Sequence, residues 1–296
     1  MTNKLILLAG SLLILAAPGI AAAQSAPALP KVLWIIREDV KPGKGALHER
    51  IEQGFARQNA KAKVLPYLAM EAVSGNATEA MFISAYDSFA QFDKDFQTFG
   101  SASNGPAKME YEALNKQEAE VVSGVQSWVA VYRPDLSYRA DHLMETLAKS
   151  RYFAIETFRV RMGHDDDFAN ASHLFQKAFE KMKSDQPYVF YQVMMGTPGG
   201  AYLLFTPMKS LKQIDDDMAN EKAFAEAFGA DNLQKLEKTA GDVFTVPIRQ
   251  DIYAFSPQMS NVSKEFAAAD PKYWSPKPPP PPKRVKKEPE PPKGQQ

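Results

Sequence analysis

Three glutamates lie within stretches that otherwise resemble apolar β-strands, and they are the first residues to consider for chemistry: Glu38, Glu71 and Glu156. Burial of a carboxylate is costly unless the group is paired or protonated. Each glutamate could therefore accept a proton or bind a ligand in a pocket. The alternative is an ion pair with a nearby cation, or simple exposure to solvent. The nearby cations are Arg37, Arg159 and Arg161.

The four histidines of the chain show no metal-ligand spacing such as H-x-x-x-H, so no metal site is predicted. They are His48, His142, His164 and His173. His48 follows directly on the first residue of an apolar helical stripe formed by Leu47, Ile51 and Phe55. It either contributes to a pocket or forms a hydrogen bond in the core.

Strand alternation groups further polar and aromatic residues with these glutamates. Leu33, Ile35, Phe153 and Ile155 are predicted to face the helices, which puts Trp34 and Glu38 on the opposite face. Adding tyrosines and a glutamine at matching strand positions gives a candidate ligand-binding pocket. Its members are Trp34, Glu38, His48, Tyr67, Glu71, Glu156, Tyr188 and Gln192.

No catalytic residue can be assigned from a motif. A Ser/His/Asp arrangement, a P-loop and a G-x-G-x-x-G dinucleotide fingerprint are not recognisable. The chain has no cysteine, which excludes disulfides, zinc–thiolate sites, iron–sulfur clusters and thiol nucleophiles. No cofactor is predicted.

An internal repeat determines how the candidate residues are positioned. Four blocks recur in the same order with offsets of 120 to 123 residues. The clearest pair is PYLAMEAVSG at 66–75 and PYVFYQVMMG at 187–196. The sequence therefore predicts two copies of one module of roughly 110 residues.

Each copy is predicted to have the order β-α-β-β-α-α-β, a ferredoxin-like split βαβ unit with an added helix. In the first copy, strands are predicted at 32–40, 67–74, 80–86 and 127–132, where Pro134 stops the last one. Helices are predicted through the stripe of Leu47, Ile51 and Phe55, at 89–99 and at 106–121. In the second copy the elements are predicted at 152–160, 167–183, 188–195, 201–206, 209–219, 221–239 and 250–255. Residues 139–150 are a connector, predicted to be helical.

The duplicated module, with V-x-x-G-K at 40–44 and V-x-x-G-H at 160–164 before its first helix, resembles the dimeric α+β barrel superfamily. Within it, the sequence is most similar to NIPSNAP-like and antibiotic-biosynthesis-monooxygenase-like modules. The resemblance covers residues 31–262 and implies that the two sheets close an α+β barrel within one chain. Some members bind haem through a helix histidine or oxidise aromatic substrates without a cofactor. No histidine here has a counterpart in the other copy, and Glu71 corresponds to Gln192, so no catalytic residue is transferred.

The N-terminus has the pattern of a secretory signal peptide, with Lys4, an apolar stretch to Leu15 and Ala21–Ala23 before the predicted cleavage site. We therefore expect a periplasmic or secreted protein with no membrane span after cleavage. The domain boundaries follow: signal peptide 1–23, first module 31–138, connector 139–150, second module 151–262, and a basic disordered tail 263–296.

The tail contains the most biased composition in the chain. Residues 275–296 include nine prolines, six basic residues and two glutamates, which predicts an extended, positively charged segment. It is either a solvated spacer or a segment that docks on an anionic envelope surface. The whole chain has zero net charge, which argues against nucleic-acid binding.

Two functional hypotheses remain open. The first is a non-catalytic exported protein that binds a small, partly apolar or aromatic molecule or another protein, indicated by the aromatic strands and the lack of a repeated catalytic set. The second is a cofactor-independent or haem-linked monooxygenase-like enzyme, which rests on the resemblance.

Overall fold

The protein is an α+β structure built on a closed antiparallel barrel of eight strands, in the order β1-β3-β2-β8-β5-β7-β6-β4. A computed structural model describes residues 29–275. The strands are β1 (Val32–Val40), β2 (Tyr67–Ala72), β3 (Glu79–Tyr86), β4 (Val122–Tyr138), β5 (Tyr152–Arg159), β6 (Tyr188–Met195), β7 (Ala201–Met208) and β8 (Arg249–Phe255). The predicted α+β class and the closure of a barrel within one chain are confirmed.

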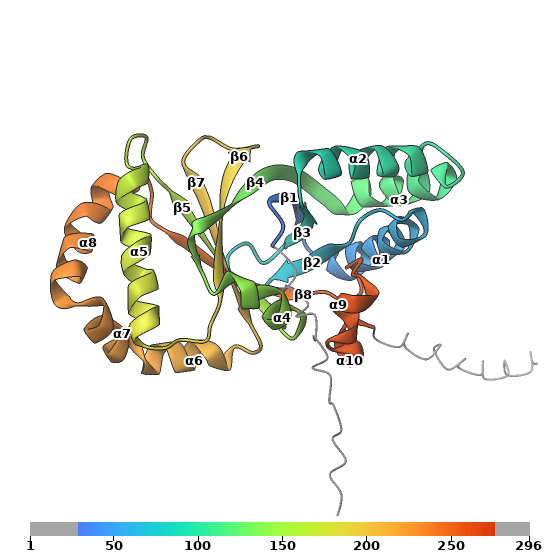
Figure 1. The fold of residues 1–296 in the computed structure, drawn as a ribbon. Helices are drawn as coiled ribbons and strands as arrows, with labels where there is room; N and C mark the ends of the chain where they lie inside the picture. The colour runs from blue at the N-terminus through green and yellow to red at the C-terminus, as the bar shows by residue number, and fades with distance from the viewer. Residues whose placement is uncertain (1–28, 276–296) are drawn as a thin grey trace, which may run out of the picture.

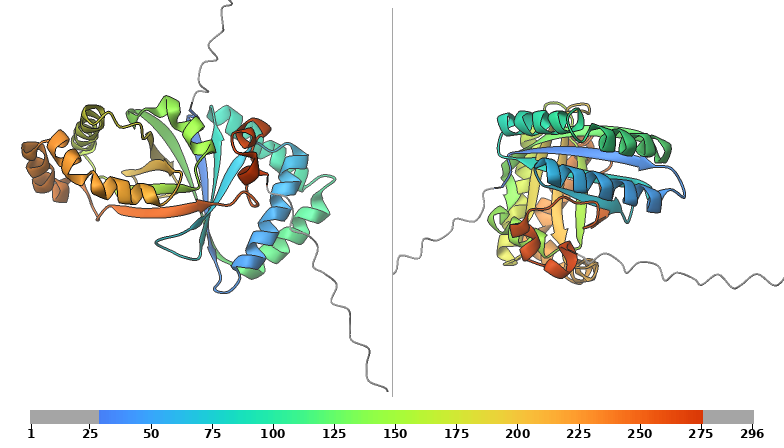
Figure 2. Two further views of the ribbon diagram at one scale, coloured as in Figure 1. Left: turned by 90° about the horizontal axis from the view of Figure 1, so that it is seen from below. Right: turned by 90° about the vertical axis from the view of Figure 1, so that its right-hand side faces the viewer.

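The helices lie on opposite sides of the barrel (Figure 1). On one side are α1 (Gly45–Ala62), α2 (Phe89–Ser103) and α3 (Lys108–Val121). On the other are α5 (Asp165–Lys181), α6 (Lys212–Ala219), α7 (Glu221–Phe228) and α8 (Ala230–Val243). Figure 2 shows the same separation from below, with the barrel between the two groups. Each helical layer thus covers the outer face of one half of the barrel.

The two halves arrange their strands in the same order around the barrel, β4-β1-β3-β2 in the first and β8-β5-β7-β6 in the second. They are joined where β2 pairs with β8 and where β4 pairs with β6. The second half differs by one additional helix, because Gly229, with φ of 94°, separates α7 from α8. The sequence predicts one helix over 221–239, and this was wrong because a positive φ ends a helix at glycine.

The predicted assignment of strand faces is reversed in the structure. Leu33, Ile35, Phe153 and Ile155 belong to one buried cluster that draws on all eight strands, and this cluster fills the barrel interior. Trp34 and Glu38 lie on the outer face and contact helices instead. Alternation separates the two faces of a strand, but it cannot tell which face is covered by helices when both are buried.

The outer face of β1 is covered by α1, whose predicted apolar stripe is confirmed in its packing. Ile51 is 2% exposed and Phe55 9% exposed, and Phe55 packs on Tyr111 of α3 at 6.3 Å between ring centroids. Burial of each such side chain contributes about 1.5–3 kcal/mol. This packing holds α1 against the strand and positions the polar residues on the same helix face.

β4 is longer than predicted and continues beyond Pro134 to Tyr138. Its pairing with β6 shifts register between Arg133 and Tyr138, and its pairing with β1 ends near Val131. Proline has no N–H to donate, so it fits at this irregular position without a β1 partner. The prediction that Pro134 stops the strand was therefore wrong.

One end of the barrel is closed by helices from the connector and the C-terminal segment. Residues 140–148 form a short 3-10 turn, η1 (Ala140–His142), and α4 (Leu143–Ala148), and two further helices follow β8: α9 (Lys264–Ala268) and α10 (Pro271–Trp274). The Trp274 indole N–H donates to the carbonyl of Ala148 at 2.7 Å, and its ring packs on Phe255. The disordered tail therefore does not begin at residue 263, because aromatic residues at 266–274 have a core to pack against.

The remaining predictions for the two ends of the chain lie outside the described residues. These are the signal peptide 1–23 with its cleavage site and the proline-rich segment from 276 onward. Within 29–275, no helix has the length and apolar character needed to cross a bilayer.

Candidate functional site

The structure does not bring the eight predicted pocket residues together. They lie on outer strand faces or on α1, and they divide between the two halves. Trp34 packs between Phe92 and Phe96 of α2, with ring centroids 5.5 and 6.1 Å away. Tyr188 packs on Tyr138 and Phe179 in the second half, and burial raises its pKa. These two aromatic residues belong to the packing between strands and helices.

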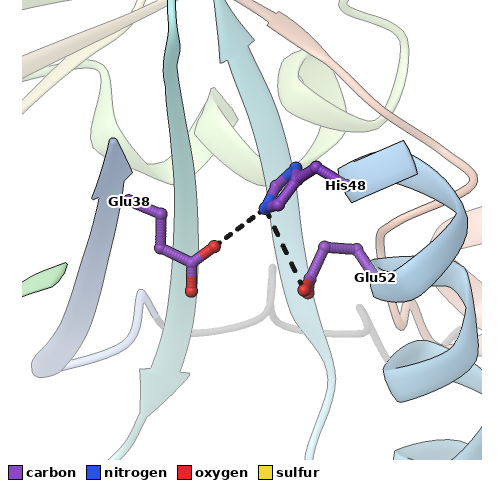
Figure 3. A group of neighbouring side chains, drawn as sticks. All are labelled: Glu38, His48 and Glu52. Atoms are coloured by element: carbon purple, nitrogen blue, oxygen red, sulfur yellow. Dashed lines mark hydrogen bonds and ion pairs between the residues drawn. The ribbon is translucent and has the colours of Figure 1, made fainter. Parts of the chain in front are cut away.

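Glu38 and His48 do meet, in a buried cluster beneath α1 (Figure 3). His48 Nε2 lies 2.9 Å from Glu38 Oε2 and 4.0 Å from Glu52 Oε1. His48 is fully buried, and each glutamate is 6% exposed. Burial, together with the charges of Glu38 and Glu118, raises the pKa of Glu52 to about 9. Glu38, His48 and Glu52 are called the Glu–His–Glu cluster below.

The other predicted polar residues lie apart from this cluster. Glu71 is exposed on β2, and its pKa is raised by desolvation and by the charge of Glu49. Glu156 on β5 has a raised pKa because it is largely desolvated, and it accepts a hydrogen bond from Gln250 at 3.3 Å. Gln192 accepts one from Arg133 at 3.1 Å.

Tyr67 lies in the small apolar cluster beneath α1 and packs on Phe82 at 6.3 Å between ring centroids. Its burial raises the pKa of its hydroxyl above the usual value. Tyr67 is therefore close to the Glu–His–Glu cluster, but it belongs to the core of the first half.

A cavity of about 270 Å³ lies inside the barrel, at the end opposite α4 and α10. Its walls combine apolar and aromatic side chains with a group of charged ones. The lining residues are Ile35, Arg37, Met81, Gln126, Trp128, Ile155, Thr157, Arg159, Leu203, Phe205, Val246, Pro247, Arg249, Asp251 and Tyr253. Pockets of this composition and placement, in the mouth of a barrel, are typical of small-molecule sites.

Arg37 and Glu79 form the most deeply buried ion pair of the cavity wall. The Arg37 guanidinium donates to both Glu79 oxygens, at 2.8 and 2.6 Å, and the Tyr253 hydroxyl donates to Glu79 Oε1 at 2.6 Å. Burial alone would lower the pKa of Arg37, but the hydrogen bonds and charge of Glu79 raise it overall. Arg37 is therefore held as a cation, 4.8 Å over the ring of Trp128.

Two further arginines face the same space. Arg249 pairs with Asp251 at 2.5 Å. Arg159 donates to the carbonyl of Pro198 at 3.3 Å and lies 6.0 Å over the Trp128 ring, and it has no carboxylate partner within residues 29–275. Three arginines thus line the cavity, and two of them have carboxylate partners, so within residues 29–275 the charge of Arg159 is not compensated by an ion pair.

Sequence reasoning named Arg37 and Arg159 only as cations that could neutralise glutamates, and it missed their role as cavity walls. Arg37 continues the alternation of Leu33 and Ile35, as Arg159 continues that of Phe153 and Ile155. An arginine that follows alternating inward-facing apolar residues on one strand indicates a charged residue at the end of the barrel interior. This pattern predicts the cavity wall only once the inner face of the strand is assigned correctly.

No protein-family profile and no curated protein matches the chain. Solved structures with a similar course of the chain include an anthrone oxidase-like protein, at 9% identity and a TM-score of 0.47, covering 81% of this chain and 97% of that one. A candidate monooxygenase from Lactobacillus acidophilus aligns at 6% identity and a TM-score of 0.46, over 76% and 94%. A chlorite dismutase variant from Candidatus Nitrospira defluvii aligns at 9% identity and 0.45, over 80% and 96%. The activities in these names belong to those proteins.

Proposed function

We propose that this chain is an exported, non-catalytic binding protein that takes up a small organic anion with a flat apolar body. The observation behind the proposal is the group of three arginines around Trp128 inside the open end of the barrel. The binding site is the cavity between Arg37, Arg159 and Arg249. The binding hypothesis from the sequence is retained, and its pocket moves from the outer faces to the barrel interior.

The charge of the ligand follows from how the arginines are paired. Arg37 and Arg249 already have carboxylate partners, whereas Arg159 has none in the described part of the chain. A guanidinium presents planar donors that match a carboxylate or phosphate, and hydrogen bonds to charged groups contribute about 1.5–3 kcal/mol. An incoming anion would therefore be bound through Arg159.

The apolar body of the ligand follows from the other walls. Trp128, Phe205 and Tyr253 are each at most 7% exposed and border the same space as the arginines. Aromatic walls favour a flat ring, which stacks on them while its acidic group reaches the guanidinium. An aromatic carboxylate satisfies both requirements.

The test uses naphthalene-2-carboxylate and its neutral carboxamide as probes, with binding followed by calorimetry. We expect the carboxylate to bind at least about tenfold more tightly than the amide. Arg159→Gln should remove that preference, whereas Arg57→Gln, at an exposed position of α1, should leave it unchanged. Equal binding of the two probes by the unaltered chain would reject an anion site, and binding of neither would reject this small-molecule function.

Export and surface docking complete the proposal and rest on sequence patterns alone. A signal peptide cleaved after Ala23 would deliver the chain to the periplasm or outside the cell. The basic segment 275–296 would attract an anionic envelope surface. Mass spectrometry of the protein recovered from separate cell fractions tests both its location in the cell and the cleavage position.

The monooxygenase-like alternative finds less support. The haem-linked reading rests on a histidine ligand, and none of His48, His142, His164 and His173 lines the cavity. An unchanged Soret band on mixing the chain with haem is the expected result.

A further inference from the structure

The Glu–His–Glu cluster brings three metal-ligating side chains to one point on the side of β1 away from the cavity. The three candidate ligand atoms lie within 4.8 Å of one another, and all three residues are buried. Figure 3 shows Glu38 from β1 and the pair His48 and Glu52 from α1 directed toward a common centre. From this geometry we propose that Glu38, His48 and Glu52 bind a divalent transition-metal ion.

Burial favours the protonated form of Glu52, and the surroundings of the cluster offer little to compensate a second carboxylate charge beside Glu38. His48 is its one basic neighbour, since no lysine or arginine forms an ion pair with Glu38 or Glu52 among residues 29–275. Glu52 Oε1 and His48 Nδ1 are buried without a hydrogen-bond partner in that same part of the chain. A buried carboxylate oxygen left in this way is expensive. A cation at the common centre would take the place of the proton on Glu52, coordinate its Oε1 and compensate the charge of both carboxylates.

Water would supply the fourth ligand of a tetrahedral site, because within residues 29–275 the ligating atoms that gather within 4.8 Å of one another come from Glu38, His48 and Glu52. With a water completing the set, the ion would connect β1 and α1. It would hold this helix of the first half to its strand.

The second half indicates that the fold does not require polar residues here. The positions 120 residues later are Phe158, Phe168 and Ser172, on the corresponding strand and helix. The rings of Phe158 and Phe168 pack at 5.3 Å between centroids. An apolar contact is therefore sufficient to pack the helix on the strand at this position. Packing alone does not explain why the first half has Glu38, His48 and Glu52 here.

The donor set selects the class of metal. One imidazole nitrogen with two carboxylates suits zinc, and manganese or iron less specifically. Ligands in a tetrahedral zinc site are about 3.3 Å apart, given bonds of about 2.0–2.2 Å. The present separations from His48 Nε2, 2.9 Å to Glu38 and 4.0 Å to Glu52, bracket that value. Small side-chain rotations would thus form the site.

The test is a titration of the full chain, stripped with a chelator, first with Co²⁺ and then with Zn²⁺. We expect one Co²⁺ per chain with the visible bands of a tetrahedral site, lost on addition of Zn²⁺. Glu52→Gln and His48→Asn should each weaken Zn²⁺ binding at least about tenfold, because even outer-shell partners of a metal are worth 10–100-fold.

The matched control is His164→Asn. His164 is a partly exposed histidine beside Asp167 at 2.9 Å, so it represents an adventitious His–carboxylate pair. That variant should bind Zn²⁺ like the unaltered chain. Absence of cobalt bands and zinc uptake in the unaltered chain would overturn the proposal. Unchanged Zn²⁺ affinity in Glu52→Gln would also overturn it. This variant keeps the shape of the side chain, so it remains a valid test if His48→Asn does not fold.

Discussion

Beneath α1, the first strand of the barrel places Glu38 against His48 of the helix; beneath α5, at positions 120 residues further along the chain, Phe158 packs against Phe168. The strands and helices involved have corresponding places in the two halves of the barrel. In the second half, Phe168 also contacts Phe190 and Tyr202, so aromatic rings surround this position. The same place in the fold thus accommodates a buried charged set or a ring stack.

The contrast separates what the fold needs from what is particular to one half. A ring stack stabilises by removing apolar surface from water, whereas a buried carboxylate–imidazole contact gains little net stability because both groups lose hydration. We therefore expect the second half to depend on this position for stability and the first half to depend on it for metal binding. Three experiments test that contrast.

The largest effect is expected for Phe168→Ala. Phe168 is 3% exposed and contacts three aromatic rings within 5.8 Å, so its truncation should lower the free energy of unfolding by about 3–5 kcal/mol. Denaturant unfolding measures the change. Phe96→Ala, at a ring that is 57% exposed, should cost far less. A loss below about 1 kcal/mol at Phe168 would contradict the contrast.

A smaller effect is expected when the first half is given the residues of the second. The triple variant Glu38→Phe, His48→Phe and Glu52→Ser replaces the buried polar set by the residues at 158, 168 and 172. Such replacements are often neutral or stabilising by about 1–4 kcal/mol. Unfolding should therefore be unchanged or shifted to higher denaturant, while cobalt binding is lost. A triple variant that does not fold would show that the first half requires its polar residues for packing.

The smallest effect concerns a carboxylate on the outer strand face of the second half, Glu156. Burial raises its pKa in the folded protein, so the folded state holds a proton that the unfolded state releases. Because the folded state binds the proton more tightly, Glu156 lowers the free energy of unfolding as pH rises. The stabilisation is fully present below the pKa of the unfolded state and is lost as pH rises through the pKa of the folded state.

Unfolding midpoints measured between about pH 4 and pH 8 should fall less with rising pH in Glu156→Gln than in the unaltered chain. Glu237→Gln, at an exposed position of α8, should follow the unaltered chain. Parallel curves for all three proteins would show that Glu156 is not desolvated.

Much of the architecture could be predicted from local patterns. The first strand at 32–40, the strand at 188–195 and the stripe of α1 follow from alternation and helical spacing. The exceptions have tertiary causes. Pro134 stays within β4 because the pairing of β4 with β6 is irregular between Arg133 and Tyr138. Helices form within residues 264–274 because their aromatic side chains pack on the core at the end of the barrel. Neither cause is visible in a local window of sequence.

The candidate site could be predicted only in part. Glu38 and His48 were both singled out, and they meet; Glu52 was missed, although its spacing of four residues from His48 places both on one helix face. A search for paired histidines cannot find a site built from one histidine and carboxylates on different elements. The arginines of the cavity escape prediction for another reason, because strand alternation alone does not distinguish the inner face of the barrel from the helix-covered face.

The position of β8 in the chain has a consequence for how the molecule is made. β8 pairs with β2 of the first half and β5 of the second, and it is the last strand to be synthesised. Until residues 249–255 are available, β2 and β5 each present an unpaired edge, and unpaired edges invite pairing with other chains. A chain truncated before this strand would form a sheet that is open at two edges and prone to aggregation. Arrival of β8, followed by the helices that end at Trp274, removes both edges and closes the end of the barrel.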